Sequence, residues 1–212
     1  MRQLNVTERA HALSLAAVAG FVDSVGFLHL GGLFVSFMSG NSTRLGVSLA
    51  EGDMPTALLA FGLLFLFVIG AALGGLIAGE GGTLARFRVL ASEATLLAGG
   101  ALAATFGFPI PAIILMVLAM GVENAVFLRN GEVGVSLTYM TGTLVKTGHA
   151  VARALRGGDR WGFAPHLLLW ASLVAGAVAG AFVYGRLGLA ALYPAALMVC
   201  ILAVRCWFNR AP

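Results

Sequence analysis

Apolar stretches of about 20 residues follow one another along nearly the whole chain, separated by short polar or glycine-rich turns. A stretch of that length and composition is typical of a helix that crosses a membrane. The pattern predicts six spanning helices, at residues 11–30, 55–78, 89–106, 110–128, 165–184 and 189–207. Two more polar segments, 33–49 and 133–155, are predicted to be broken or re-entrant. The predicted fold class is therefore an all-α polytopic membrane protein.

The most polar part of the chain occurs twice in similar form. The stretch "FMSGNSTRLG", which begins at Phe37, has a near copy in "YMTGTLVKTG", which begins at Tyr139, an offset of 102 positions. Three further positions match across the two halves: Gly20 with Gly121, Asp23 with Asn124, and Gly74 with Gly176. We therefore predict one membrane domain built as a tandem duplication, with repeat one at 11–106 and repeat two at 110–207.

The arginines indicate how the two repeats are oriented, because Lys and Arg of short loops lie on the cytoplasmic side of a membrane. If segments 33–49 and 133–155 do not cross, the arginines near both termini, in the 79–88 loop and around 153–160 share one side. The other side receives Glu51, Asp53 and Arg186. This arrangement predicts cytoplasmic N- and C-termini and two halves inserted upside down relative to each other, the inverted-repeat plan of many secondary transporters.

Composition supports a multi-pass protein of the inner (plasma) membrane whose main partner is the lipid bilayer. The 212 residues are 59% hydrophobic and 10% charged, against roughly 25% charged in soluble domains. The net charge of +4 is explained by the orientation of the loops, so no nucleic-acid partner is expected. The first apolar stretch continues past Gly20 without a convincing cleavage site, and we interpret it as a membrane helix rather than a signal peptide.

The duplicated motif predicts a binding site. Each copy follows a β-branched and aromatic run, so we expect an extended strand, a glycine turn, and a short helix that starts near Asn41 or Thr143. A helix start at membrane depth suits an anion or a carbonyl oxygen. Two such starts predict one midplane substrate site, made by Ser39, Gly40, Asn41, Asn124, Thr141, Gly142 and Thr143. The alternative is that these small residues only pack helices closely.

Ionisable residues inside the helices are the second candidate feature. Asp23 and Glu123 lie at matching depths, where a charge costs on the order of 3 kcal/mol or more. We expect them to carry a proton during transport, the alternative being that each holds the backbone of a motif. Arg44 and Lys146 either balance an anionic ligand or carboxylate, or extend to the membrane interface. Glu93 is expected to be a solvated or paired residue near a helix end, the alternative being a proton relay.

No residue pattern indicates a metal, a cofactor or catalysis. His29, His149 and His166 have no second ligand at helical spacing, and neither a nucleotide-binding loop nor a nucleophile–base pair stands out. We expect a secondary transporter or channel for a small polar or anionic solute. The alternatives are a non-transporting interaction or scaffold protein and, less in keeping with the sequence, a membrane-embedded enzyme. So few helices enclose a pathway poorly, and a homodimer is expected.

The motifs also carry a resemblance. "GFVDSVGF" and "FVSFMSGNSTRLG", followed by "GVENAVFL" and "LTYMTGTLVKTG", resemble the YoaK-like family of bacterial integral membrane proteins over essentially the whole chain. The family is known chiefly as one of unknown function, and it is sometimes described as a family of small-molecule transporters. The resemblance therefore implies a membrane protein and supplies no substrate. The family pattern more often has glutamine where this chain has Glu123.

Overall fold

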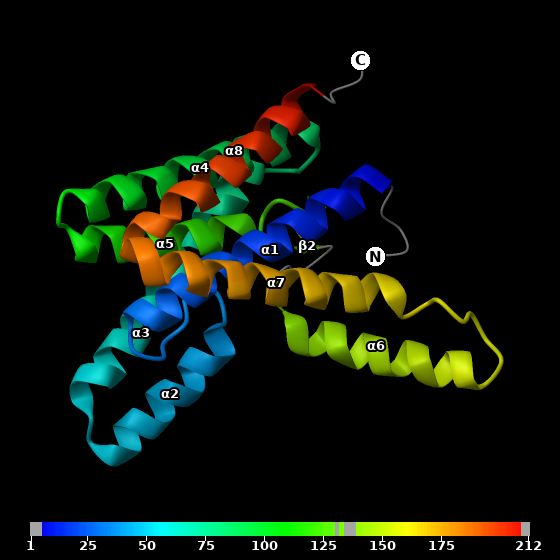
Figure 1. The fold of residues 1–212 in the computed structure, drawn as a ribbon, viewed down its shortest axis with the longest axis horizontal. Helices are drawn as coiled ribbons and strands as arrows, with labels where there is room; N and C mark the ends of the chain where they lie inside the picture. The colour runs from blue at the N-terminus through cyan, green and yellow to red at the C-terminus, as the bar shows by residue number, and fades with distance from the viewer. Residues whose placement is uncertain (1–5, 130–131, 134–138, 209–212) are drawn as a thin grey trace.

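The computed structural model describes residues 6–129, 132–133 and 139–208, and in this part the chain is almost entirely helical (Figure 1). The elements in chain order are α1 (Val6–His29), α2 (Met38–Glu51), α3 (Met54–Ala78), α4 (Thr83–Thr105), α5 (Pro109–Glu123), β1 (Leu128–Arg129), β2 (Glu132–Val133), α6 (Met140–Leu155), α7 (Ala164–Leu187), the 3-10 helix η1 (Gly188–Ala191) and α8 (Leu192–Phe208). The all-helical prediction is confirmed, apart from the short hairpin of β1 and β2.

Four stretches of the described chain are long and apolar enough to cross a membrane, namely Glu8–His29, Met54–Ala78, Thr83–Thr105 and Ala164–Phe208. The last has 45 residues and contains both α7 and α8. The protein is therefore a multi-pass helical membrane protein. Helix α5 has 15 residues, a length of about 22 Å that falls short of a hydrocarbon core of about 30 Å.

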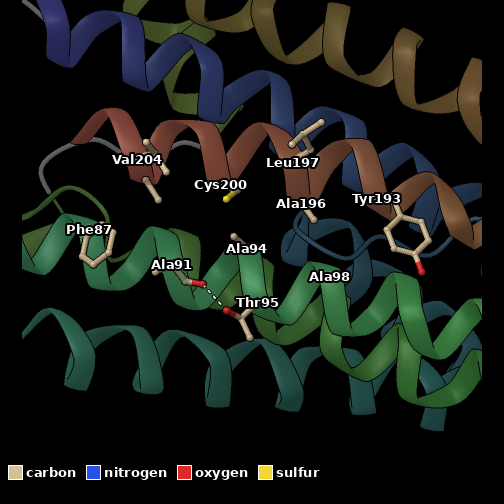
Figure 2. A pocket seen from close by; sticks show the side chains of 11 residues that line it. Phe87, Ala91, Ala94, Thr95, Ala98, Tyr193, Ala196, Leu197, Cys200 and Val204 are labelled. Carbon is tan, nitrogen blue, oxygen red and sulfur yellow. Dashed lines mark hydrogen bonds between the residues drawn. The ribbon is translucent and has the colours of Figure 1, made fainter. Parts of the chain in front are cut away.

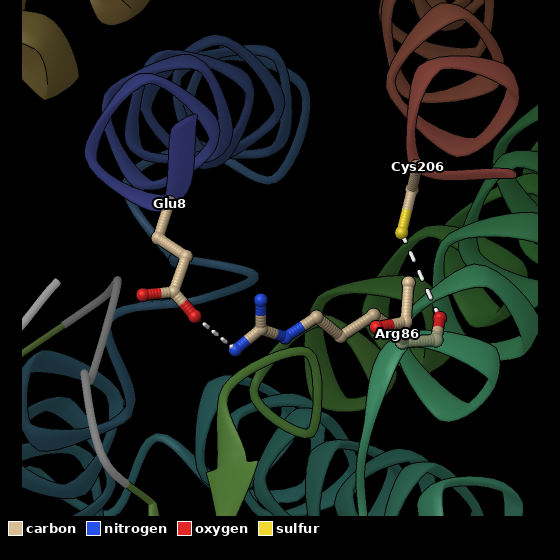
Figure 3. Close-up of polar contacts among 4 residues, drawn as sticks. Glu8, Arg86 and Cys206 are labelled. Atoms are coloured by element: carbon tan, nitrogen blue, oxygen red, sulfur yellow. Dashed lines mark hydrogen bonds and ion pairs between the residues drawn. The ribbon is translucent and has the colours of Figure 1, made fainter. Parts of the chain in front are cut away.

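Helix α4 begins at Thr83, and the prediction that it begins at residue 89 was wrong. Arg86 and Arg88 lie in its first two turns rather than in a loop. Arg86 is neutralised there, because its Nη2 donates to Glu8 Oε1 of α1 at 2.7 Å (Figure 3). Its guanidinium also lies over the Phe127 ring, 5.4 Å from the centroid. The starts of α1 and α4 are thereby joined at one end of the molecule.

Helix α5 ends at Glu123, five residues before the predicted end at residue 128. The Asn124 side chain donates to the Met120 carbonyl at 2.9 Å, and tight turns follow, in which the backbone N–H of Val126 donates to the Glu123 carbonyl at 3.1 Å. The chain then pairs β1 with β2 in antiparallel register. The turn residues 124–127 contain neither Gly nor Pro, so the sequence has no helix breaker at the point where α5 ends.

Glycines set the closest helix contacts, and the two halves use them alike. Helix α1 lies along α7, and α3 lies along α5. The first crossing has Gly20 against the Leu173 carbonyl, Gly176 against the Ala17 carbonyl and Gly180 against the Phe21 carbonyl. The second has Gly121 against the Phe67 carbonyl, Gly70 against the Leu118 carbonyl and Gly74 against the Val122 carbonyl. A Cβ at any of these glycines would overlap backbone of the facing helix.

These contacts correct one predicted correspondence. Gly74 takes the place of Gly180 in the second crossing, and Gly70 takes that of Gly176, an offset of 106 rather than 102. The match of Gly74 with Gly176 was therefore wrong. The starts of α2 and α6 keep the offset of 102. The chain from the start of α6 to the glycines of α7 is therefore longer, by about one helical turn, than the chain from the start of α2 to the glycines of α3.

Helices α2 and α6 start in the middle of the molecule and run toward opposite ends (Figure 1). They have 14 and 16 residues, which corresponds to about 21 and 24 Å, less than a membrane core. Helix α2 turns into α3 at Gly52, whose φ of 76° is left-handed, and α6 turns toward α7 at Gly157, whose φ is 85°. Both helices are therefore too short to cross a membrane by themselves.

Candidate functional site

The two copies of the motif form the first turns of α2 and α6, which begin at Met38 and Met140. The predicted starts near Asn41 and Thr143 were three residues late. An aromatic residue, Phe37 or Tyr139, precedes each helix, and neither start has a side-chain cap. Ser, Thr and Asn, the residues that most often cap a helix start, therefore do not occupy the cap position of either helix.

The motif glycine has a different role from the predicted backbone turn. A Cβ on Gly40 would overlap the Phe37 ring, and a Cβ on Gly142 would overlap the Tyr139 ring. The glycine lies inside the helix and lets the aromatic ring fold over the first turn. The two helices share this local structure because the Phe/Tyr–x–x–Gly spacing is the same in both.

The chain before α2 is irregular, and no strand forms at 33–37, so the strand predicted there was wrong. Side chains hold this backbone instead. Asp23 Oδ1 accepts the N–H groups of Val35 and Ser36, both at 2.8 Å. The Asn41 side chain binds both backbone groups of Phe34. Asn41 Oδ1 accepts the Phe34 N–H at 2.9 Å, and Asn41 Nδ2 donates to the Phe34 carbonyl at 2.7 Å. The equivalent segment of repeat two, 134–138, lies outside the described residues.

A cavity of about 290 Å³ lies between the starts of α2 and α6. Four segments of the chain line it. They are the start of α2 (Ser36, Phe37, Met38 and Ser39), α3 (Phe67), the turn after α5 (Asn124) and the start of α6 (Tyr139, Met140 and Thr141). Hydroxyl and amide groups thus face the cavity together with three aromatic rings. Both copies of the motif contribute to one cavity.

The structure brings three of the seven predicted substrate residues to this cavity, namely Ser39, Asn124 and Thr141. The other four support it. Asn41 is fully buried beside Phe34, Thr143 is buried with its hydroxyl donating to the Tyr139 carbonyl at 3.3 Å, and Gly40 and Gly142 lie under the aromatic rings. The sequence did not indicate Phe67, because an apolar residue within an apolar helix carries no pattern.

Arg44 and Lys146 do not line the cavity. Both are exposed, and the Arg44 charge acts on Asp53 at the turn between α2 and α3. This position agrees with the alternative in which the cation extends to the interface.

Two glutamates lie in the core near this site. Glu93 is in the middle of α4 and Glu123 is the last residue of α5, and both side chains have 0% exposure. The prediction that Glu93 is a solvated or paired end residue was wrong, since α4 begins a full turn and a half earlier than expected. Within the described residues, none of the four carboxyl oxygens of Glu93 and Glu123 has a hydrogen-bond partner.

Asp23, which is half-buried, is the third carboxyl group of this region. The charge of Glu123 acts on Glu93, and the charge of Asp23 acts on Glu123. Only Asp23 has donors among the described contacts, from the backbone at Val35 and Ser36. This backbone contact corresponds to the alternative interpretation of Asp23, in which it holds the motif.

A second cavity, of about 560 Å³, lies between α4 and α8 (Figure 2). Its lining is mainly alanine and larger apolar side chains, and the hydroxyls of Thr95 and Tyr193 are already bonded, to the Ala91 carbonyl at 2.8 Å and to Thr105 at 3.2 Å. It offers little to recognise a polar solute. The cavity at the helix starts is therefore the candidate site.

Comparison with known proteins agrees with this description. The family described as "Protein of unknown function (DUF1275)" matches residues 11–205. UPF0700 transmembrane protein RA0705 of Rhizobium meliloti (strain 1021) is 34% identical over 192 residues, which cover 89% of this chain and 81% of that protein. UPF0700 transmembrane protein YoaK of Bacillus subtilis (strain 168) is 33% identical over 137 residues, 61% of each chain. No solved structure matches. The chain belongs to the DUF1275 family of transmembrane proteins, the YoaK-like family that its motifs resemble.

Proposed function

We propose that this protein is a secondary transporter or channel for a small polar or anionic solute, which binds in the cavity between the starts of α2 and α6. The observation that carries the proposal is that both copies of the duplicated motif line one cavity. Two distant segments of similar sequence meet there, and a packing motif alone would not have to leave space between them.

The electrostatics of the cavity favour an anion or a carbonyl oxygen. A helix N-terminus carries about half a positive charge and N–H groups without intrahelical partners, and two such ends meet here. No carboxylate is among its described lining residues. The volume of about 290 Å³ lies at the lower end of small-molecule sites, at roughly 300–1,000 Å³. A solute of a few non-hydrogen atoms fits best.

Alternating access follows from an inverted repeat, which is the architecture we propose. The equivalent glycine crossings of α1 with α7 and of α5 with α3 support a duplication, and the opposite directions of α2 and α6 support its inversion (Figure 1). Six spanning segments with cytoplasmic termini in the inner membrane complete this proposal, together with a homodimer. Native mass measurement in lipid that finds only monomers would exclude the dimer.

Ligand binding tests the site itself. A thermal-shift screen of the purified protein against small metabolites and anions identifies binders, and uptake into proteoliposomes then shows whether a binder is transported. Ser39→Ala and Thr141→Val each remove one hydroxyl from the cavity lining, and we expect dissociation constants to rise about two- to tenfold, the value of one hydrogen bond. Ser42→Ala, an exposed position outside the lining, is the control. Equal affinity in all three variants would refute the site.

Cysteine labelling tests the topology. Cys200 and Cys206 are replaced by serine, and single cysteines are placed at the exposed positions Glu51 and Arg160. The two sites should react from opposite sides of the membrane, because α2 and α6 run toward opposite ends. Reaction of both from one side would rule out the inverted arrangement.

A further inference from the structure

We infer that Glu93 and Glu123 form a proton-binding pair in the core of the protein and that this pair couples transport to protons. The coupling rests on the transport function proposed above, whereas proton binding by the pair does not depend on it. The inference starts from geometry. Glu93 of α4 and Glu123 of α5 come from adjacent helices, are both fully buried, and have no hydrogen-bond partner for any carboxyl oxygen within the described residues.

A buried carboxylate without a partner is too costly to stay ionised. Transfer of an isolated charge into an apolar interior costs far more than transfer of a neutral polar group, and such a group takes up a proton instead. Ionising both carboxyl groups, on two helices that pack together, would add their mutual repulsion. At least one proton must therefore be held by the pair, and its release requires water or an acceptor to reach these side chains.

Among the residues that the structure describes, no cation pairs with Glu93 or Glu123. Helix α4 packs against α3, α5, α8 and η1. Helix α3 and η1 contain no charged residue, and α8 contains only Arg205, which lies in its last turn. The charged group that acts on Glu93 is Glu123, and the one that acts on Glu123 from α1 is Asp23. Both neighbours are acidic, so both raise the cost of ionising the pair.

The titratable residues of the facing elements do not reach the pair in any described contact. Tyr193 of α8 bonds to Thr105 at 3.2 Å, and Cys206 bonds to the Thr83 carbonyl at 3.7 Å. Cys200 is exposed and lines the cavity between α4 and α8. Within α1, Glu8 binds Arg86 at one end and His29 contacts Tyr184 at the other. His11 lies near Arg86 and Glu8 at the first of these ends.

A proton suits this pair better than a metal ion. In the part of the chain that the structure describes, no three His, Cys, Asp or Glu residues are grouped so that they could hold a metal. Two carboxyl groups alone provide too few ligands for the six to eight oxygens of a calcium site. Proton binding needs only one oxygen, with RCOO⁻ and H⁺ forming RCOOH and no other bond changing.

The pair is connected to the proposed solute cavity on two sides. Asn124, which lines the cavity, directly follows Glu123 at the end of α5. Ser36, which also lines it, donates its N–H to Asp23, the acidic neighbour of Glu123. A movement of the cavity wall on solute binding would thus shift Glu123 or its acidic neighbour. This link is how proton release by the pair would depend on whether the cavity is filled.

Infrared spectroscopy of the protein in lipid vesicles measures the pair without transport. The C=O stretch of a protonated carboxyl group is followed as a function of pH, and the variants are Glu93→Gln, Glu123→Gln and the double variant. We expect the wild-type protein to show a protonated carboxyl signal at neutral pH. The signal should persist in each single variant, whose remaining buried carboxyl group still holds a proton, and should be lowest in the double variant. Glu51→Gln, at an exposed carboxylate, should leave it unchanged. A wild-type protein without the signal, or an unchanged signal in the double variant, would overturn the pair.

Proteoliposome transport measures the coupling separately. For a solute that the wild-type protein carries, Glu93→Gln should abolish accumulation driven by a pH gradient and retain exchange between equal solute pools. Normal pH-driven accumulation in this variant overturns the coupling. If the wild-type protein carries no solute although the infrared signal is present, the transport function fails and the pair stands. If glutamine variants do not fold, Glu93→Met and Glu123→Met replace them, and the wild-type signal at neutral pH still decides whether a proton is held.

Discussion

Replacing Asn41 by alanine should strongly destabilise the protein, because this side chain satisfies backbone that nothing else in the described structure reaches. Asn41 is fully buried, and it pairs with both the N–H and the carbonyl of Phe34, at 2.9 and 2.7 Å. Residues 33–37 form neither helix nor strand. Irregular backbone at membrane depth persists only where its polar groups find partners in protein or in a watery cavity.

The expected loss of unfolding free energy follows from the two backbone groups of Phe34 that would lose their hydrogen-bond partner. A buried donor or acceptor left without a partner costs about 1–3 kcal/mol, so the loss of both Phe34 contacts gives about 2–6 kcal/mol. Phe34 is only partly buried and the cavity is near, so water repairs part of the loss. We therefore expect Asn41→Ala to lower the free energy of unfolding by about 2–4 kcal/mol.

Reversible unfolding in mixed micelles, followed by circular dichroism, measures this difference. Ser42→Ala is the matched control, since Ser42 is the next residue, is exposed, and donates only to the Met38 carbonyl of its own helix. We expect it to stay within about 0.5 kcal/mol of the wild-type protein. An Asn41→Ala variant as stable as Ser42→Ala would show that Asn41 does not hold the segment before α2.

Two further predictions concern helix packing and a helix start. Gly74→Ala should destabilise the protein relative to Gly75→Ala by about 1–3 kcal/mol. The reason is that a Cβ at Gly74 would lie 2.8 Å from the Val122 carbonyl oxygen, whereas a Cβ at Gly75 meets nothing within 4 Å. Equal unfolding free energies of the two variants would refute the close crossing of α3 and α5. Asp53 accepts the Thr56 N–H at 3.2 Å, and hydrogen bonds from Thr56 hold the pKa of Asp53 below its ordinary value. Its stabilising effect is therefore present at neutral pH and is lost as pH falls through that lowered pKa. Asp53→Asn should remove this part of the pH dependence of unfolding, and an unchanged acid profile would contradict it.

The helices and the cavity could be predicted from the sequence because their signals are local or repeated. Long apolar runs identified six of the eight α-helices to within a few residues at most of their ends, and the duplicated polar motif located the other two, α2 and α6. The second copy of the motif predicted that Ser39 and Thr141 lie near each other, and both line one cavity. Asn124 was found by the same comparison of the two halves.

The missed features depend on contacts between distant residues. Arg86 and Arg88 suggested a loop, whereas α4 begins before them and Arg86 pairs with Glu8 of α1, a contact that the sequence does not reveal. That error shifted Glu93 from the middle of α4 to its end and concealed a buried carboxyl group. Likewise, Phe37 and Tyr139 start their helices by folding a ring onto a glycine, which capping preferences for Ser, Thr and Asn do not describe.

Asp23 is the residue for which the structure changes the expectation most. Its Oδ1 accepts two backbone N–H groups at 2.8 Å, from Val35 and Ser36. The Oδ1 of an asparagine can accept both, so Asp23→Asn should fold, as the Asn124 at the matching position suggests. Asp23→Ala leaves the N–H groups of Val35 and Ser36 without a hydrogen-bond acceptor, and should lower the free energy of unfolding by about 2–5 kcal/mol.

Transport then distinguishes the two roles of Asp23. If it only holds the backbone before α2, Asp23→Asn keeps both solute exchange and accumulation driven by a pH gradient, while Asp23→Ala loses both with its stability. If it carries the coupled proton, Asp23→Asn keeps exchange and loses pH-driven accumulation. We expect the first result, because the two N–H groups that Asp23 accepts give it a structural role before α2, whereas Glu93 and Glu123 have no such donors among the described residues. Loss of pH-driven accumulation in a folded Asp23→Asn protein would assign the proton to Asp23 instead.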